Sequence, residues 1–311
     1  MARRRKGVPV HGWLVLDKPP GLTSTQAMAK CRWLLNAEKA GHGGTLDPIA
    51  TGILPIAYGE ATKTVPYAME GEKTYRFTLR FGEARNTDDL AGTVTATSDA
   101  RPSDEAIEAV LPRFTGWIEQ VPPQFSAIKV DGERAYDLAR EGETVDLKPR
   151  RVRVDAIHLT GRPSPDLAEF EVECGKGTYM RSLARDIALA VGTVGHVAAL
   201  RRLRVGRFTL REAVTLEALE RLIADGAAPP LLPIETALDA LPTVPLSETE
   251  AGRLRQGQPV LLIRRQDLER LSRVAESVSG EATALATAHG QPVALVRVEG
   301  AEIRPVRVLN V

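Results

Sequence analysis

The stretch from Gly41 to Lys63 constrains this 311-residue chain more than any other. It opens with three glycines in four residues around His42, and then presents a single acid, Asp47, between a leucine and a proline. Glycine allows backbone conformations that are closed to other residues, and proline biases the residue before it away from helix. The stretch therefore predicts a shaped loop that carries one carboxylate or, equally well, a plain Asp-Pro turn among loop glycines.

The composition is that of a globular protein, with 43% hydrophobic and 26% charged residues, and it predicts a substantial core. No apolar run approaches the roughly 18 residues that a membrane span requires. The chain begins Met-Ala-Arg-Arg-Arg-Lys, and no apolar signal region follows this basic segment. We therefore expect a cytoplasmic protein with a basic N-terminal arm at residues 1–9 and no membrane partner.

The cysteines and histidines do not form a recognisable metal-binding pattern. Cys31 and Cys174 are far apart and belong to no Cys-x-x-Cys pair, so we expect two small buried residues rather than a zinc site or a disulfide. The histidines, at positions 11, 42, 158, 196 and 289, show no ligand spacing. The sequence therefore predicts no metal.

Basic residues are clustered although the net charge is only +1. Residues 148–153 contain one lysine and three arginines, and residues 201–207 contain four arginines. Such clusters either neutralise phosphates or lie on solvated strand faces. Two clusters together with the basic N-terminal arm favour a polyanionic partner.

Strand and helix patterns alternate irregularly along the first 240 residues. Lys73–Phe81 alternates strictly and predicts a half-buried antiparallel strand. Periodicity predicts further strands at 11–18, 93–97, 151–160 and 167–174, and helices at about 23–36, 103–114, 134–141, 179–191 and 215–225. This mixture predicts an α+β fold with a mixed, mainly antiparallel sheet flanked by helices.

A proline-containing linker at 240–245 separates this part from the tail. Beyond the linker, a short helix at 247–256 and strands at 259–263, 291–298 and 303–309 predict a small β-rich domain. We therefore expect a main domain at 10–240 and a C-terminal domain at 241–311. Within the main domain, a strand-turn-helix excursion at 124–152 is flanked by arginines and reads either as a mobile clamp or as a simple insertion.

Two side chains on the predicted elements are open to two interpretations. Tyr75 lies on the apolar face of its strand, where it is either a core aromatic or a cleft residue, because its hydroxyl needs a partner. Arg181 falls in the first turn of the helix at 179–191, where a cation opposes the helix dipole. That placement indicates an anionic partner for Arg181, for which Asp47 is a candidate, unless the arginine is merely exposed.

Taken together, five segments resemble the TruB family of tRNA pseudouridine-55 synthases. The Gly41–Pro48 segment with Ala50-Thr-Gly52 is similar to the catalytic motif of that family. The other four segments are Leu14–Pro19, Lys73–Arg76, Gly177–Arg181 and Leu200–Leu203, and all five occur in the family's order along the chain. The resemblance covers residues 10–210 well and the tail more loosely. It implies the pseudouridine synthase catalytic fold over 10–240 and a PUA-like RNA-binding domain over 241–311.

The resemblance also implies roles for single residues. Asp47 would be the nucleophile, Arg181 its ion-pair partner, and Tyr75 would pack on the uracil, so these three are the candidate catalytic residues. The candidate substrate-binding residues are His42, which would replace or stack on the flipped base, Tyr179 close to the reacting nucleotide, Leu200 on the pocket floor, and Lys18 and Lys63, which would shape the loop or meet phosphates.

The reaction that the resemblance implies is isomerisation of the T-loop uridine of tRNA. The uridine would flip out of its stack, and Asp47 would attack either C6 of the base or C1′ of the ribose. The 124–152 excursion would clamp the T-arm and the C-terminal domain would touch the acceptor stem. We expect a monomer that needs no cofactor.

Two readings from other classes compete with this one. The first is a non-catalytic tRNA-binding or folding chaperone on the same fold. The second is a hydrolase that uses Asp47 alone, which the absence of a second carboxylate motif disfavours.

Overall fold

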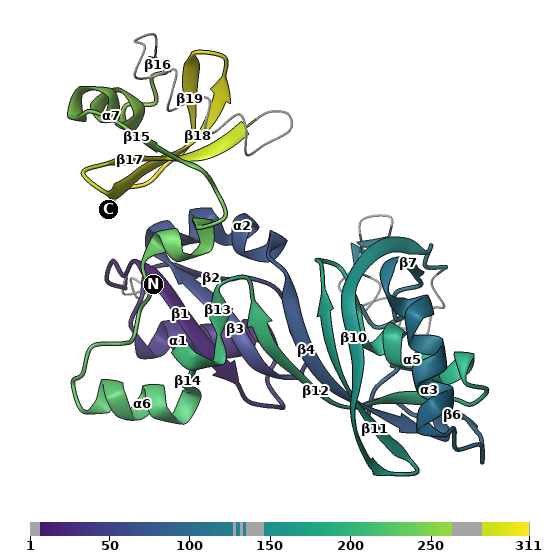
Figure 1. The fold of residues 1–311 in the computed structure, drawn as a ribbon. Helices are drawn as coiled ribbons and strands as arrows, with labels where there is room; N and C mark the ends of the chain where they lie inside the picture. The colour runs from purple at the N-terminus through teal and green to yellow at the C-terminus, as the bar shows by residue number, and fades with distance from the viewer. Residues whose placement is uncertain (1–6, 127–128, 131–132, 135–145, 263–281, 311) are drawn as a thin grey trace.

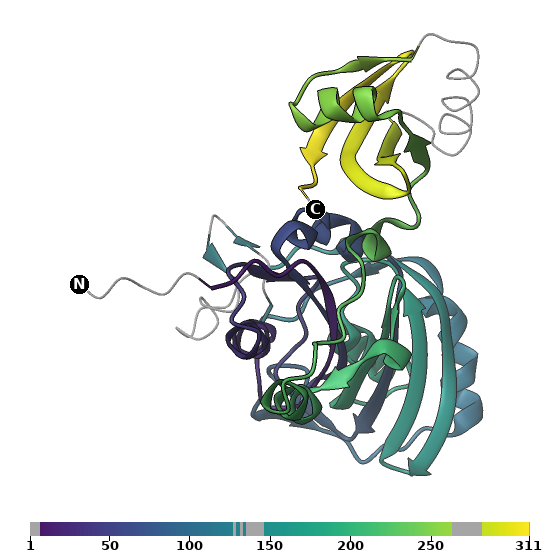
Figure 2. The same cartoon turned by 90° about the vertical axis from the view of Figure 1, so that its left-hand side faces the viewer.

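A computed structural model describes residues 7–126, 129–130, 133–134, 146–262 and 282–310. These residues form a large body built on one long sheet and a smaller C-terminal lobe built on another (Figures 1 and 2). The helix predicted at 134–141 lies, from residue 135 on, outside the described residues. No helix within the described ranges has the length and hydrophobicity needed to cross a bilayer.

The long sheet is mixed and mainly antiparallel, as predicted. Only the β1·β14 and β3·β12 pairs within it are parallel. Its strand order is β14 (Val214–Thr215), β1 (Gly12–Lys18), β3 (Thr51–Tyr58), β12 (Gly195–Val205), β4 (Lys73–Phe81), β11 (Leu167–Cys174), β10 (Arg150–Ser164) and β7 (Gly116–Gln120), with β2 (Ala40–His42) on β3 and β13 (Phe208–Thr209) on β12. Strands β3 and β12 were not predicted, yet they lie at the centre of the sheet.

Helices cover one face of this sheet along its length (Figure 1). They are α1 (Ser24–Leu34), α3 (Asp104–Val110) with η2 (Leu111–Phe114), α5 (Met180–Ala190) and α6 (Leu216–Ala224). Each was predicted from its apolar spacing. Leu183 and Ile187 of α5 are fully buried, in the same apolar cluster as Phe77 and Leu79 of β4.

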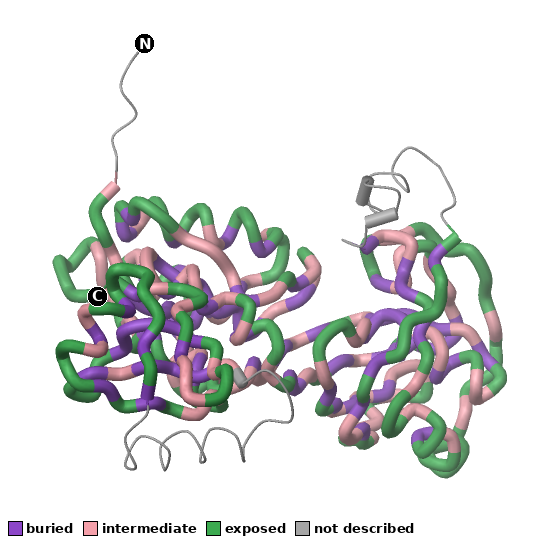
Figure 3. Tube along the Cα trace, turned by 90° about the horizontal axis from the view of Figure 1, so that it is seen from above, coloured by how far each residue is buried: buried purple, intermediate pink, exposed green. Residues whose placement is uncertain are grey.

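On the opposite face, the described residues form a covering layer at the β1 and β3 end. There, η1 (Gly59–Thr64), α2 (Val65–Glu70) and η4 (Ile234–Leu238) pack against the sheet. Strand β1 is therefore buried on both sides: Leu14 faces the helices, whereas Trp13 faces η4 and donates a hydrogen bond from Nε1 to the carbonyl of Ile234. Figure 3 shows how buried segments run through the middle of the body.

Within its described residues, the C-terminal lobe is a five-stranded sheet with one helix, α7 (Glu248–Arg255). Its strand order is β15 (Thr243–Pro245), β17 (Ala282–Ala288), β18 (Gln291–Glu299), β19 (Glu302–Val308) and β16 (Val260–Leu261). The predicted strands are confirmed, and two more join them: β17, and β15 in the segment predicted as a linker. Leu285, Leu295 and Leu309 join the apolar cluster around Trp13, so the lobe packs directly on the large body.

Shorter elements complete the described chain. They are the hairpin of β5 (Glu83–Arg85) and β6 (Val94–Thr97), the hairpin of β8 (Lys129–Val130) and β9 (Glu133–Arg134), and η3 (Leu210–Glu212). The two cysteines are free and buried, as predicted. Burial raises the pKa of the Cys31 thiol to about 12 and that of the Cys174 thiol to about 11.

Helix α1 begins with a capping box that positions the segment facing the Asp47 loop. The Thr23 hydroxyl accepts a hydrogen bond from the backbone N–H of Gln26, whose side chain accepts one from the backbone N–H of Thr23. We expect Thr23→Ala to lower the free energy of unfolding by about 1 kcal/mol. Chemical denaturation measures this change; Thr23→Ser, which keeps the hydroxyl, should match the wild type, and equal losses in both variants would contradict the cap.

Candidate active site

Asp47 lies in the connection between β2 and β3, and its neighbours on both sides are anchored. Leu46 is buried and exchanges two hydrogen bonds with the Ser24 hydroxyl, which accepts from the Leu46 N–H and donates to its carbonyl, at 2.7 and 3.1 Å. The Pro48 carbonyl accepts from the backbone N–H of Gly21 at 2.8 Å. The Asp47 side chain remains 31% exposed. The loop therefore fixes its backbone in the protein while presenting the carboxylate to solvent.

Arg181 forms an ion pair with Asp47. Its Nε lies 2.9 Å from one carboxylate oxygen, and its Nη2 donates a hydrogen bond of 3.0 Å to the other. The Arg181 side chain is only 5% exposed although it lies in the first turn of α5. The unfavourable position of a cation at a helix N-terminus is thus offset by the anionic partner that the sequence suggested.

Backbone carbonyls fix the guanidinium of Arg181 from two further directions. Nη1 donates to the Thr87 carbonyl at 3.0 Å, and Nη2 donates to the Phe125 carbonyl at 2.9 Å. Asp89 lies 3.9 Å away as a second, more distant carboxylate. The sequence did not indicate these contacts, because carbonyl acceptors leave no trace in residue type.

Tyr179 occupies the N-cap position of α5, and the side chain of Gln120, which the sequence did not indicate, holds its backbone. The Gln120 amide accepts from the Tyr179 N–H at 3.0 Å and donates to the Tyr179 carbonyl at 3.2 Å. Burial raises the pKa of the Tyr179 hydroxyl, and the positive charges of Arg181 and Arg150 oppose that shift. Tyr179 is therefore close to the ion pair and to the start of β10.

Tyr75 and Leu200 come from the neighbouring central strands β4 and β12. Leu200 is buried opposite Phe77 in the strand register, and its carbonyl accepts from the Thr51 hydroxyl at 3.4 Å. Burial raises the pKa of the Tyr75 hydroxyl, while the charge of Arg202 opposes this and that of Asp47 adds to it. Both predicted residues thus flank the Asp47 loop.

His42 ends β2, just before the loop. Its Nδ1 is buried and has no hydrogen-bond partner among the described residues. Burial lowers the pKa of the imidazole, and the nearby charge of Arg202 lowers it further. A neutral ring with an unsatisfied nitrogen at the mouth of the loop is suited to contact a base.

Lys18 shapes the loop and does not reach solvent. Its ammonium donates to the carbonyls of Leu22 at 2.7 Å, Pro19 at 2.9 Å and Pro48 at 3.3 Å. The residue is fully buried, and burial lowers its pKa to about 8 against the opposing effect of Asp47. Of the two roles considered for Lys18, the geometry fits loop shaping and not a phosphate contact.

Lys63 is the predicted residue that the structure does not bring to Asp47. Its ammonium lies 2.6 Å from the Glu60 carboxylate and donates to the Val308 carbonyl of the C-terminal lobe at 2.7 Å. The Asn310 N–H donates to the same carboxylate at 2.8 Å. The sequence placed Lys63 with the loop because they adjoin along the chain, but β3 carries it away to the contact between the two sheets.

The two basic clusters have different environments. In the 201–207 cluster, Arg201 pairs with Asp17 at 2.7 Å and Arg204 lies 3.7 Å from Glu72. Arg207 pairs with Asp239, and Arg202 is buried. In the first cluster Arg153 pairs with Asp155 at 2.6 Å and Arg151 covers the Trp117 ring at 4.8 Å, while Lys148 and Arg150 are exposed without an ion pair in the described chain.

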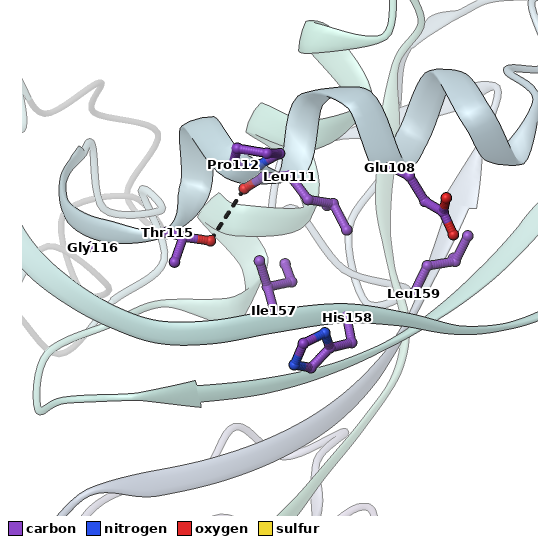
Figure 4. Close-up of a pocket in the computed structure, with 8 residues that line it drawn as sticks. All are labelled: Glu108, Leu111, Pro112, Thr115, Gly116, Ile157, His158 and Leu159. Atoms are coloured by element: carbon purple, nitrogen blue, oxygen red, sulfur yellow. Dashed lines mark hydrogen bonds between the residues drawn. The ribbon is translucent and has the colours of Figure 1, made fainter.

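A separate hollow of about 690 Å³ lies between η2 and β10 (Figure 4). Leu111, Ile157 and Leu159 contribute apolar walls, and Glu108 and His158 lie at its margins. None of the predicted site residues lines it. Because it lacks convergent polar groups, we place the candidate site at the Asp47–Arg181 pair instead.

No group of three or more acidic, histidine or cysteine side chains within the described residues could hold a metal ion. The site instead consists of one carboxylate, one paired guanidinium, two tyrosines, a neutral imidazole and an aliphatic floor. This arrangement can present an ionised nucleophile beside aromatic surfaces that suit a nucleobase.

Comparisons with known proteins agree with this arrangement. Two family models match, "TruB family pseudouridylate synthase (N terminal domain)" over residues 32–180 and "tRNA pseudouridylate synthase B C-terminal domain" over 181–239. Relatives called tRNA pseudouridine synthase B include one from Rhodospirillum rubrum, 52% identical over the full length of both chains, and one from Bradyrhizobium diazoefficiens, 53% identical over 99% of this chain and 88% of the relative.

Similar folds occur in solved structures. A chain in the "Crystal Structure of a Cbf5-Nop10-Gar1 Complex" aligns with a TM-score of 0.73 at 25% identity, covering 100% of this chain and 91% of that one. The mixed sheet, the helices on one face and the C-terminal lobe are common to that architecture. With both family models matched in succession and relatives at half identity over their whole length, the chain belongs to the TruB family of pseudouridylate synthases.

Proposed function

We propose that this chain converts the T-loop uridine at position 55 of tRNA to pseudouridine, with Asp47 as the nucleophile. Family membership and the relatives named tRNA pseudouridine synthase B support the reaction class, which is an isomerisation. The observation that carries the residue assignment is the partly exposed Asp47 carboxylate paired with a buried arginine at 2.9 Å. A lone carboxylate suffices because the detached base is retained and rejoined, unlike in glycosidases that pair two acids.

The carboxylate begins the reaction by covalent attack on C6 of the uracil or C1′ of the ribose. The bond between N1 and C1′ breaks, the base turns, C5 bonds to C1′, and the bond between the carboxylate and the substrate breaks to regenerate Asp47. N1 gains a proton and C5 loses one, so the net change is an isomerisation without oxidant or reductant. Covalent attack divides one difficult bond cleavage into easier steps.

Arg181 holds its positive charge within hydrogen-bond distance of the Asp47 carboxylate and so fixes the orientation of the nucleophile. Its own position is fixed by the Thr87 and Phe125 carbonyls, so it need not reorganise during the reaction. Tyr75 and Tyr179 supply aromatic surface for a uracil that has left its stack, and Leu200 supplies an apolar floor. Unstacking costs a few kcal/mol, roughly, which such contacts and a filler like His42 would offset.

The RNA backbone would pass over the exposed start of β10. Lys148 and Arg150 are exposed there with no ion-pair partner among the described residues, which leaves them to meet phosphates, and the charge of Arg150 acts on Tyr179. Both residues belong to the 124–152 excursion, which supports its role as a clamp on the T-arm. A single-stranded loop with splayed bases is the form of RNA that proteins read most readily.

Conversion of an isolated T-arm stem-loop tests the proposed function. The wild-type chain should form one pseudouridine per stem-loop, and a stem-loop whose target uridine is replaced by cytidine should form none. Binding of the stem-loop without any conversion would instead identify a tRNA-binding chaperone.

Lys63 offers a test of the C-terminal lobe as the second RNA contact. Because Lys63 joins Glu60 to the end of β19, Lys63→Ala should loosen the lobe. We expect affinity for full tRNA to fall about 3- to 10-fold, on the order of 1 kcal/mol, with affinity for the stem-loop unchanged. Equal losses for both RNAs would contradict an acceptor-stem role of the lobe, and Lys176→Ala, at an exposed ion pair with Glu70, is the matched control.

A further inference from the structure

Arg202 is a buried cation for which the described chain provides no carboxylate partner. The residue is 1% exposed, and its guanidinium is surrounded by protein on the central strand β12. Three hydrogen bonds from its side chain go to backbone carbonyls, and the side chain also hydrogen-bonds that of Tyr75. A buried charge is a poor means of stabilising a fold, because apolar residues of similar volume usually serve as well or better. Its position therefore suggests another use.

The three carbonyl partners of Arg202 lie on both sides of Asp47. On the side before it, Nη2 donates to the Gly44 carbonyl at 3.2 Å and Nη1 to the Thr45 carbonyl at 3.3 Å. On the side after it, Nε donates to the Ile53 carbonyl at 2.7 Å. One guanidinium thus joins the two stems of the loop that carries Asp47.

The backbone of Arg202 meets the same loop. Arg202 pairs with Gly52 where β12 and β3 run parallel. Gly52 has φ +94°, and a Cβ there would lie 2.1 Å from the Arg202 carbonyl oxygen, so only glycine permits this approach. The close packing leaves the second stem little freedom to move relative to Arg202.

Arg202 also faces the predicted base platform. It is the register partner of Tyr75 where β12 pairs with β4. The charge of Arg202 acts on both Tyr75 and His42. The nucleophile loop, the tyrosine and the histidine therefore share one neighbour that makes no contact with solvent.

We propose that Arg202 is a positioning residue that fixes the Asp47 loop relative to Tyr75. This inference rests on the proposed function. Arg202 touches neither substrate nor reacting atoms; its guanidinium, through three carbonyls, sets where the carboxylate stands relative to the aromatic surface that receives the base. A displacement of about 1 Å in such a constellation is enough to cost on the order of 100-fold in rate.

Substitution by lysine tests the proposal, because lysine keeps the charge but cannot reach three carbonyls in the planar arrangement of a guanidinium. With a T-arm stem-loop, Arg202→Lys should lower kcat at least about 10-fold per folded molecule, with KM within about 3-fold of wild type. Arg204→Lys, on the same strand but partly exposed, should change kcat less than about 2-fold. A purely structural role would instead lower the folded fraction and leave kcat per folded molecule intact.

Two further variants keep the test decisive if Arg202→Lys does not fold. Gly44→Ala changes the same contact from the side of the loop. Gly44 has φ +108°, and an added Cβ would lie 3.6 Å from Nη1 of Arg202. Alanine should therefore strain the backbone at the carbonyl that accepts from Arg202. It should lower kcat in the same way. In Arg202→Ala, added guanidinium chloride at a non-denaturing concentration should restore part of kcat, whereas it should not restore Asp47→Asn.

The outcomes separate the inference from the function on which it rests. Wild-type kcat per folded molecule in Arg202→Lys or Gly44→Ala, with an active wild-type chain, overturns the positioning role alone. Loss of affinity for the stem-loop with kcat unchanged also overturns it, since it would indicate an RNA contact. A wild-type chain that converts no uridine refutes the proposed function and this role with it.

Discussion

Asp47→Asn should abolish pseudouridine formation while leaving RNA binding intact. The amide is nearly isosteric with the carboxylate and can still contact Arg181, but it cannot act as the covalent nucleophile. We expect kcat on a T-arm stem-loop to fall at least about 10⁴-fold, which corresponds to roughly 5.5 kcal/mol of transition-state stabilisation. The dissociation constant for the stem-loop should stay within about 3-fold of the wild-type value, since no more than about 0.7 kcal/mol of binding is at stake.

A control variant shows whether the loss of turnover is specific to Asp47 or follows from replacing any aspartate. Asp99 is exposed in the connection between β6 and α3, and Asp99→Asn should have wild-type turnover. Single-turnover assays with tritium at C5 of the target uridine would report the loss of the C5 proton directly. Substantial conversion by the Asp47→Asn protein would remove Asp47 from the mechanism.

Arg181→Lys should reduce turnover far more than binding. Lysine keeps the positive charge, yet it cannot contact both oxygens of Asp47 and also donate to the Thr87 and Phe125 carbonyls. The carboxylate would lose its fixed orientation and a buried carbonyl would lose a donor. We expect kcat to fall about 10- to 100-fold, on the order of 1.4–2.7 kcal/mol, with KM nearly unchanged.

The control for this variant is an arginine with no role at the site. Arg221 lies exposed on α6, and Arg221→Lys should match the wild type in both constants. Thermal unfolding of each variant distinguishes a loss of catalysis from a loss of structure. If Arg181→Lys lost affinity and turnover in equal measure, Arg181 would act as a phosphate contact and not as the partner of Asp47.

Local patterns in the sequence predicted the elements that follow one period. The alternation at Lys73–Phe81 and the periodic spacing of the helices at about 23–36 and 179–191 each determine local structure, and each element is present as expected. The ion pair between Asp47 and Arg181 could also be predicted from the sequence. A cation in the first turn of a helix needs an anion nearby, and the loop offered one.

The central strands escaped prediction because their burial depends on partners elsewhere in the chain. Strand β12 carries Arg201 and Arg202, which a local pattern assigns to solvent. In the structure Arg201 is neutralised by Asp17, and Arg202 is satisfied by carbonyls 149 to 158 residues away. Long-range hydrogen bonding of this kind leaves no periodic signal.

The same limit explains what was missed at the site. Gln120 and the Thr87 carbonyl support Tyr179 and Arg181, but an isolated glutamine and a backbone group carry no signal in a single sequence. Lys63 shows the converse error, in which closeness along the chain suggested closeness in space. Strand β3 runs between Asp47 and Lys63. It brings Lys63 to the C-terminal lobe instead of to the carboxylate.

Mapping pseudouridine at single-nucleotide resolution in unmodified tRNA tests the central claim most directly. Full-length tRNA is treated with the wild-type chain or with Asp47→Asn, and modified sites are located by chemical labelling and primer extension. The wild-type chain should modify the T-loop uridine at position 55 alone, and Asp47→Asn should modify none. Modification of that uridine by both proteins, or by neither, would contradict the claim that this chain is a tRNA isomerase acting through Asp47.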